Sequence, residues 1–353
     1  MIELDKVQKE IVNSTAHKIL VIAGSGSGKT RVLTERIKKL INNGIRTDKI
    51  VAITFTNAAA DEMKERLGDI IGNAYIGTIH GYANKILLIN GIDTSKYIEE
   101  EDFDKFFELI KENTIDFPII EHLLVDEYQD ISQKENEFFK LLNPKNFMAV
   151  GDDYQNIFGF RNADVSIFMD MARDNETKVY FMTNNYRSGA EIMEFANYFM
   201  DLVQDKIYKE TYCKNNYGEV IRINNFNEQY IINTIKITDE YKDWFILTRT
   251  NSQIDWIGDI LSDNDIPWTS FKKSELSSEQ LKSKMKENTV KILTVHSAKG
   301  LENKNVIVLG VKPYWDEERR VAYVAASRAK ELLIWVKSIN HKKDTKPKIK
   351  SWG

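Results

Sequence analysis

The sequence predicts an α/β protein of two lobes, each built on a parallel sheet with helices on both faces. Apolar, strand-like runs alternate with helical patterns along the chain, as βαβ units require. The runs lack a strict period of two, which is typical of strands buried on both faces. A length of 353 residues favours more than one domain.

The strand-like runs are short and divide between the two lobes. They read ILVIA, KIVAITFT, YIGTIH, HLLVDE and NFMAVGD, and then VYFMT, EVIRINNF, WFILTRT, VKILTVH, NVIVLGV and ELLIWVK. We expect a first lobe over 1–182 and a second over 183–340, with NNYRSGAEIMEFANYFM beginning a new helix at the boundary. A charged, aromatic stretch over 87–117 predicts a small helical insertion in the first lobe.

Composition restricts the class of protein. The chain is 42% hydrophobic, and no apolar run approaches the ~20 residues that span a bilayer, so we expect a cytoplasmic protein without membrane contact. The single Cys213 cannot form an internal disulfide. A net charge of −4 argues against a uniformly basic surface, although a local cationic groove remains compatible with it. The basic tail 341–353 is either a phosphate contact or a solvated, disordered end.

Residues 23–30 read AGSGSGKT directly after the apolar run ILVI. Glycines in such a loop turn backbone N–H groups inward, Lys29 reaches the β and γ phosphates, and Thr30 offers its hydroxyl to Mg²⁺. The amphipathic helix that follows directs its positive N-terminal dipole at the same phosphates. The loop therefore predicts ATP binding. The predicted phosphate-binding residues are Ala23, Gly24, Ser25, Gly26, Ser27, Gly28, Lys29, Thr30 and Arg31.

A second strand-like run, LLV, ends in DEYQD at 126–130. Carboxylates at such a strand end hold Mg²⁺ and activate water in phosphate-binding NTPases. We expect Asp126 and Thr30 to hold the metal, and Glu127 to orient or deprotonate the attacking water. An acidic loop alone is usually structural, but its pairing with the glycine loop favours hydrolysis.

The chain resembles the UvrD/Rep family of superfamily 1 helicases. The resemblance lies in ITFTNAAADEMKERL, VDEYQD, VGDDYQNIFGFRNA, NNYRS, VHSAKGLE and VAYVAASRAK, which occur in the family's order. It extends from Gln8 to Lys330 and implies two RecA-like lobes.

The resemblance also assigns roles to residues at matching positions. It implies adenine reading by Gln8, adenine stacking by Tyr186 and ribose contact by Glu302. It implies γ-phosphate sensing by Gln155, and phosphate contacts by Arg187 and Arg328 from the second lobe. Always-charged guanidinium groups stabilise charge on a transferring phosphoryl group.

DNA contact is implied for a further set of residues. Phe55 and Phe160 match aromatic platforms, on which bases stack without sequence preference, and Arg161 matches a backbone contact. Phe160 stands where relatives often have tryptophan. The remaining candidates, which contact phosphates or couple the sites, are Thr54, Asn57, His80 and His296.

Both insertions of larger relatives are reduced here. Only 277–289 separates the segment IPWTSFKKSEL from VKILTVHSAKGLE, where the family has a large extra domain. The resemblance implies ATP-driven 3′ to 5′ movement on single-stranded DNA or a tailed duplex, in replication, recombination or repair. A protein partner that loads the motor or separates the strands is compatible with the reduced chain. The alternatives are an ATP-gated DNA-binding module that does not move, and a P-loop kinase with a small acceptor.

Overall fold

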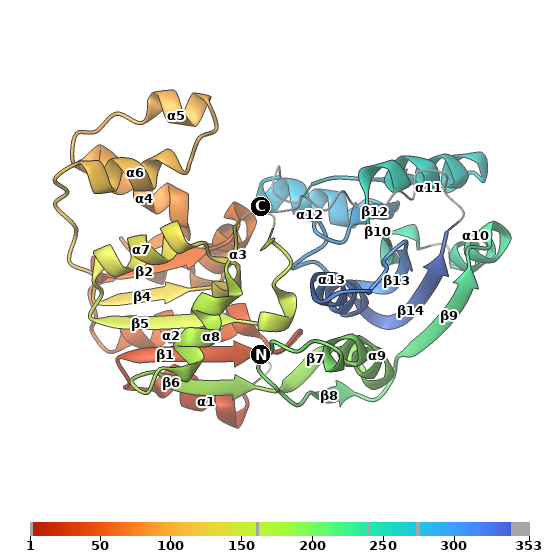
Figure 1. The fold of residues 1–353 in the computed structure, drawn as a ribbon, viewed down its shortest axis with the longest axis horizontal. Coiled ribbons are helices and arrows are strands. Elements are labelled where there is room, and N and C mark those ends of the chain that lie inside the picture. Colours follow the sequence, from red (N-terminus) through yellow and green to blue (C-terminus); the bar gives the residue numbers. More distant parts are fainter. Residues whose placement is uncertain (1–2, 160–161, 239, 273–275, 340–353) are drawn as a thin grey trace. The chain divides into compact units, whose positions relative to one another are not determined.

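A computed structural model describes residues 3–159, 162–238, 240–272 and 276–339. The chain forms two compact units, each with its own sheet (Figure 1). Unit 1 comprises Met1–Tyr186 and Asp205–Tyr212, and unit 2 comprises Arg187–Gln204 and Cys213–Gly353. The predicted α/β class with two parallel sheets is confirmed, and each sheet has the organisation of a RecA-like lobe.

The sheet of unit 1 has six parallel strands in the order β3-β2-β4-β5-β1-β6. Their bounds are β1 Lys18–Ala23, β2 Ile50–Thr54, β3 Tyr75–Thr78, β4 His122–Val125, β5 Asn146–Gly151 and β6 Lys178–Met182. All six coincide with predicted strand-like runs. The order places the ends of β1 and β4 on either side of β5, so the loops after these three strands are neighbours at one edge.

Helices cover both faces of this sheet. They are α1 Lys6–Asn13, α2 Lys29–Asn42, α3 Asn57–Leu67, α4 Ile79–Ile89, α5 Ser95–Glu99, α6 Lys105–Glu112, α7 Gln133–Leu142 and α8 Val165–Arg173. Alternate residues of β1 enter different cores: Leu20 and Ile22 pack with α4, α6, α7 and α8, whereas Ile19 and Val21 pack with α1, α2 and α3. Burial on both faces explains why the strands read as continuous apolar runs.

The predicted insertion at 87–117 contains the end of α4, all of α5 and all of α6. Figure 1 shows these helices together at one end of unit 1. Phe106, Phe107 and Ile110 form the buried stripe of α6 and join the core below it. The amphipathic pattern therefore anchors this stretch to unit 1.

Unit 2 has a second sheet of six parallel strands, in the order β11-β12-β10-β13-β14-β9. The strands are β9 Glu219–Asn225, β10 Trp244–Thr248, β11 Trp268–Thr269, β12 Val290–Thr294, β13 Asn303–Leu309 and β14 Ala329–Ser338. The helices are α9 Ala190–Asp201, α10 Glu228–Lys236, α11 Asn251–Asp263, α12 Ser278–Lys286 and α13 Asp316–Ala326. Ile246, Ile292 and Ile334 pack on one face with α10 and α11, and α9 packs on the other through Phe195 and Trp335.

The predicted helix start at NNYRS is wrong. Residues Asn184–Gly189 form a strand, β7, which pairs with β8 (Tyr212–Asn215), and α9 begins only at Ala190. A Cβ on Gly189 would lie 1.6 Å from the carbonyl oxygen of Tyr217, so the strand passes very close to a neighbouring backbone. This long-range approach has no local sequence signal.

The two units also divide differently from the predicted 182/183 boundary. The chain leaves unit 1 after Tyr186, returns to it for Asp205–Tyr212, and then continues in unit 2. The predicted basic tail, 341–353, lies outside the described residues. Within the described ranges, no helix has the length and apolar character needed to cross a membrane.

Candidate functional site

The glycine loop lies between β1 and α2, at the carboxyl edge of the first sheet. Ala23 ends β1 and is buried, and the Gly24 N–H donates to the Met182 carbonyl at 3.2 Å. Gly28 precedes the helix with φ 89°, a left-handed conformation that favours glycine. Lys29 and Thr30 then form the first turn of α2, as the sequence predicts.

Three successive carbonyls of this loop accept hydrogen bonds from surrounding protein. Asn185 Nδ2 donates to Ser25 O at 2.6 Å, Tyr186 N donates to Gly26 O at 3.0 Å, and Gln8 Nε2 donates to Ser27 O at 2.9 Å. In a trans peptide the carbonyl and the following N–H point in opposite directions. The N–H groups of Gly26 and Gly28 therefore face away from these partners, as a phosphate cradle requires.

Gln8 is 2% exposed, and its amide is engaged at both ends. Its Nε2 holds Ser27 O, and its Oε1 accepts from the Asp5 N–H at 3.1 Å as part of the capping box that begins α1. The predicted adenine-reading residue therefore supports the glycine loop in this structure.

Tyr186 lies in unit 1, not in the second lobe as the resemblance implied. Its hydroxyl donates to Asp5 Oδ2 at 2.7 Å, and its ring is 40% exposed. Burial, followed by the bond to Asp5, raises the pKa of Tyr186 to about 12, and the charge of Arg31 acts on it in the opposite direction. Burial alone would raise the pKa of Asp5, but hydrogen bonds from Gln8 and other donors lower it overall.

The acidic pair Asp126 and Glu127 follows β4 at the same edge. Glu127 has φ 51° and ψ 40°, an unusual conformation for a residue with a side chain. Its Oε2 lies 3.3 Å from Lys29 Nζ and accepts from Gln129 Nε2 at 2.7 Å. Such strained positions concentrate at functional sites. The structure thus brings the predicted base and the phosphate-binding lysine together.

The predicted sensor Gln155 lies on the loop after β5 and is 3% exposed. Its Nε2 donates to Asp152 Oδ2 at 2.7 Å. The Asp152 N–H in turn donates to Gln129 Oε1 at 2.9 Å. Gln129 thus links the sensor loop to Glu127, a connection that the sequence analysis missed although Gln129 lies within its DEYQD motif.

The oxygen donors near the loop fit Mg²⁺. Within the described ranges, no group of three or more His, Cys, Asp or Glu side chains is arranged to hold a metal. Mg²⁺ in nucleotide sites is usually held by one or two protein oxygens, with phosphates and water supplying the rest. The Thr30 hydroxyl and the Asp126 carboxylate are donors of that kind.

In unit 2, the predicted residues Glu302 and Arg328 directly precede β13 and β14, and Arg187 lies in β7. Arg187 Nε forms an ion pair with Glu302 Oε2, and Lys330 Nζ lies 3.0 Å from Glu302 Oε1. Although burial raises the pKa of Glu302, the charges of Arg187 and Lys330 lower it overall. Arg328 is 1% exposed, and its guanidinium donates to Val324 O at 2.9 Å and to Leu301 O at 3.2 Å.

Of the predicted DNA contacts, Phe55 and Asn57 are exposed. The Phe55 ring is 39% exposed and stacks on Phe158 with a centroid distance of 5.1 Å. Thr54 is buried, and its hydroxyl donates to Thr56 O at 3.0 Å, so its side chain holds the turn before α3. Phe160 and Arg161 lie outside the described residues.

The two predicted histidines differ in their surroundings. His80 packs against Phe103 and Phe107, with ring centroids 5.9 and 5.3 Å away, and burial lowers its pKa. The His80 ring therefore contributes to packing, and its predicted DNA contact stays a prediction. His296 is half-buried in the turn that follows β12.

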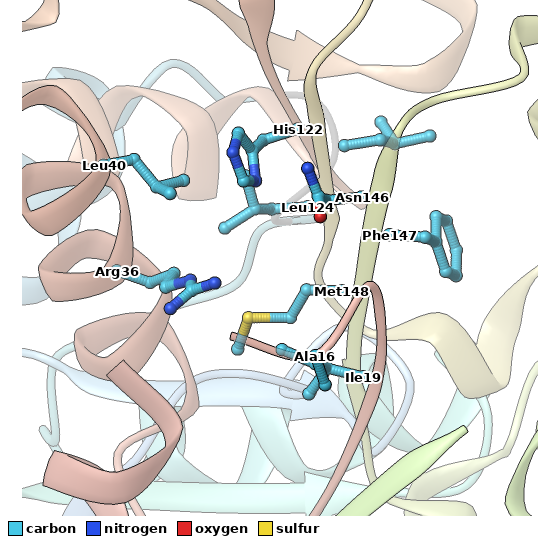
Figure 2. A pocket seen from close by; sticks show the side chains of 10 residues that line it. Ala16, Ile19, Arg36, Leu40, His122, Leu124, Asn146, Phe147 and Met148 are labelled. Carbon is cyan, nitrogen blue, oxygen red and sulfur yellow. The ribbon is translucent and has the colours of Figure 1, made fainter. Parts of the chain in front are cut away.

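The amino edge of the first sheet holds a different feature, a cavity of about 10 Å³. Figure 2 shows Arg36, His122, Asn146 and Met148 around it. This volume is about enough for one water molecule, far below that of a nucleotide. Burial and the nearby Arg36 lower the pKa of His122 to about 4.

Two parallel α/β units and a glycine loop beside strand-end carboxylates define a P-loop NTPase. Comparison with known families makes this more specific. The UvrD/REP helicase N-terminal domain matches 4–119 and 118–176, and the UvrD-like helicase C-terminal domain matches 180–276 and 271–339. The chain belongs to the UvrD/REP family of superfamily 1 helicases.

Curated relatives include a probable DNA helicase of Mycoplasma pneumoniae, which is 25% identical in a match that covers 95% of this chain and 83% of that protein. The ATP-dependent DNA helicase PcrA of Staphylococcus aureus is 26% identical in a match that covers 74% of this chain and 50% of PcrA. PcrA of Staphylococcus epidermidis is 26% identical over 367 residues, again covering 50% of its length. The chain thus spans about half the length of these PcrA proteins.

Proposed function

We propose that this protein is an ATP-driven motor that moves 3′ to 5′ along single-stranded DNA. The observation that carries the proposal is Glu127, held in a left-handed conformation with its carboxylate 3.3 Å from Lys29 Nζ. A pure binding module has no need for a strained carboxylate beside the phosphate-binding lysine. Family membership, with the relatives' printed names, supports ATP and DNA as the ligands.

Unit 1 supplies the binding and the base chemistry in this proposal. A triphosphate on the loop would exchange the ion pair between Lys29 and Glu127 for contacts between Lys29 and phosphate oxygens. Glu127, freed from Lys29 and still held by Gln129, would orient and deprotonate water. Mg²⁺, held by Thr30 and Asp126, would neutralise charge on the phosphates.

Arg187 and Arg328 supply the cations that act on the γ-phosphate in this proposal. Both already have carboxylate or carbonyl partners within unit 2. A phosphoryl group in transfer is a stronger partner for a guanidinium than a neutral carbonyl, because charge-assisted hydrogen bonds are about twice as strong. Phosphoryl transfer would therefore draw Arg328 away from its carbonyl partners, and that change would contribute to each step.

Single-stranded DNA is proposed to lie over the Phe55 surface at the carboxyl edge of the first sheet. The exposed Phe55 ring offers a stacking face to any base, which gives contact without sequence preference. If backbone phosphates contribute to binding, affinity falls as salt rises.

The proposal covers movement along single-stranded DNA and does not include separation of duplex strands by this chain alone. Between β11 and β12, where larger relatives have a whole domain, the described residues form one helix, α12, of nine residues. Among the described residues of this stretch, no domain-sized element is present that could act as a wedge between DNA strands. A partner protein is the proposed source of strand separation or loading.

Displacement of streptavidin from biotinylated single-stranded DNA tests movement and polarity together. We expect ATP-dependent displacement from the 5′ end and none from the 3′ end. Displacement from the 3′ end alone would reverse the polarity. An ATP-gated clamp would release streptavidin from neither end.

A Glu127→Gln variant is the matched control, since it keeps the shape and removes the base. It should bind DNA and ATP but displace nothing. Tailed duplexes then test unwinding separately, with 3′-tailed, 5′-tailed and blunt substrates compared in one series. Unwinding of the 3′-tailed duplex alone would show that the chain separates strands without a partner.

A further inference from the structure

Lys209 is a buried lysine beside the predicted sensor loop. Its side chain is 3% exposed, and its Nζ lies 2.8 Å from Asp152 Oδ1 and 2.5 Å from Asp153 Oδ1. The ammonium group also lies over the Tyr154 ring, 3.4 Å from its centroid. Both carboxylates are fully buried. A buried cation is tolerated only with such partners, so the position of Lys209 is strongly fixed.

A second contact attaches the same segment to the same loop. The Ile207 N–H donates to Asp153 Oδ2 at 2.8 Å. Asp153 thus receives one hydrogen bond from the backbone of the segment and one from its lysine. The segment Asp205–Tyr212 is therefore pinned to the sensor loop at two points.

The cluster connects to the catalytic residues through hydrogen bonds. Asp152 Oδ2, on the carboxylate that Lys209 holds, accepts from the predicted sensor Gln155 at 2.7 Å. The Asp152 N–H donates to Gln129 Oε1 at 2.9 Å, and Gln129 Nε2 donates to Glu127 Oε2 at 2.7 Å. A shift of Lys209 would therefore act on both the sensor and the proposed base.

The course of the chain gives this attachment a mechanical consequence. Asp205–Tyr212 belongs to unit 1, but the residues on both sides, Arg187–Gln204 and Cys213 onward, belong to unit 2. The segment is thus covalently joined to unit 2 at both ends and fixed to the sensor loop in its middle. Any displacement of unit 2 pulls on the segment that Lys209 anchors.

We propose that Lys209 is a positioning residue for ATP hydrolysis. By holding Asp152 and Asp153 it sets the positions of Gln155 and Glu127, and it makes them depend on the segment that joins the two units. This inference rests on the proposed ATPase function. A merely structural lysine would change stability and leave the turnover of the folded enzyme unchanged.

Steady-state ATP hydrolysis with single-stranded DNA separates these roles. We expect Lys209→Met to lower kcat at least about tenfold with KM for ATP changed less than about twofold, because the phosphate cradle itself is untouched. Lys209→Arg, which keeps the charge, should recover part of kcat. Tyr208→Ala is the matched control from the same segment, since Tyr208 is 70% exposed, and it should hydrolyse ATP like the wild type.

A double variant keeps the test possible if the Lys209→Met protein does not fold. Lys209→Met with Asp153→Asn removes one cation and one anion, so the net charge of the cluster stays that of the wild type. We expect it to show the same loss of kcat. A folded Lys209→Met or double variant with kcat within twofold of the wild type overturns the proposal, as does a raised KM at normal kcat. A wild type without DNA-stimulated hydrolysis overturns the proposed function instead.

Hydrogen exchange on the wild-type chain tests the mechanical link without any variant. We expect the amides of 150–156 and 205–212 to change protection together when a non-hydrolysable ATP analogue is added to the DNA-bound protein. A change in 150–156 with none in 205–212 would overturn the link.

Discussion

The two sheets of this protein present their functional candidates at opposite edges. In unit 1, the glycine loop, Glu127 and Gln155 follow the carboxyl ends of β1, β4 and β5. In unit 2, Glu302 and Arg328 precede the amino ends of β13 and β14. Open α/β sheets generally bind ligands at the carboxyl ends of their strands. This rule finds the candidate site in unit 1, but it misses Glu302 and Arg328 in unit 2.

We infer from this difference that the two similar sheets carry different parts of the proposed reaction. The candidates of unit 1 are joined to one another through Gln129 and Asp152, and the glycine loop is braced from outside by Gln8 and Asn185. In unit 2, the two candidate cations are held by their own unit, Arg187 by the Glu302 carboxylate and Arg328 by backbone carbonyls. We interpret unit 1 as the binding half and unit 2 as the half that supplies charge.

The largest expected effect is that of Lys29→Ala. Loss of this cation removes both the phosphate contact and the partner of Glu127, so ATP hydrolysis should fall at least about 10³-fold, in the upper range for loss of a charge-stabilising group. ATP binding should also weaken. The rate of ATP hydrolysis and the affinity for ATP should be measured on one preparation of the variant. A wild-type rate of hydrolysis would contradict the assignment of ATP binding to unit 1.

Arg328→Ala should leave nucleotide binding largely intact and lower hydrolysis about 10³-fold, the low end for an arginine finger. Arg328→Lys keeps the charge but not the planar fork, and it should recover only a small part of the activity. Because Arg328 is buried, thermal unfolding of both variants is the control. Equal loss of binding and hydrolysis would contradict the division of roles.

Phe55→Ala should weaken single-stranded DNA binding by about 1–3 kcal/mol, the usual contribution of one stacked base. ATP hydrolysis without DNA should stay at the wild-type rate. The DNA concentration for half-maximal stimulation measures the effect, with Phe55→Trp as the variant that keeps an aromatic face. If DNA stimulated the Phe55→Ala variant as it stimulates the wild type, the carboxyl edge of the sheet in unit 1 would not be the DNA-binding surface.

His122, at the amino edge of the sheet in unit 1, should make the free energy of unfolding depend on pH and should have no effect on ATP hydrolysis. Its native pKa of about 4 lies below the ordinary histidine value of 6.5, so the unfolded chain binds the proton more tightly. The stabilising contribution of neutral His122 is thus present above pH 6.5 and is lost as pH falls toward 4. Between pH 7 and 5 the loss should be about 2 kcal/mol.

Denaturant unfolding of the wild type and of His122→Gln at these two pH values measures that loss. The difference in unfolding free energy between the two proteins should change with pH by this amount, while their ATP hydrolysis at pH 7 agrees. A variant with the same pH dependence as the wild type would show that His122 is not the responsible group.

Much of the fold was predictable because parallel strands that are buried on both faces appear in the sequence as continuous apolar runs. Strands β1 and β10 contain the continuous apolar runs ILVIA and WFIL, since both faces of each sheet are covered. The strand β7 was not predictable, because its conformation depends on the approach of Gly189 to the backbone of Tyr217, a contact between distant parts of the chain.

The candidate site was predictable in its motifs and not in its connections. Lys29 and Glu127 lie in recognisable patterns, and the structure places them at ion-pair distance. The roles of Gln129 and Asp152 come from hydrogen bonds across neighbouring strand ends, which strand order alone decides. Lys209 had no local signal, because its partners lie more than fifty positions earlier in the sequence.

The most direct test of the central claim is the rate of ATP hydrolysis during a titration with single-stranded DNA. If unit 1 binds ATP and unit 2 supplies the cations, the protein should hydrolyse ATP slowly without DNA. At saturating single-stranded DNA the rate should be at least about tenfold higher, which corresponds to a difference of about 1.4 kcal/mol in the activation barrier. The Lys29→Ala protein supplies the baseline. One unchanged rate across the titration would contradict the account.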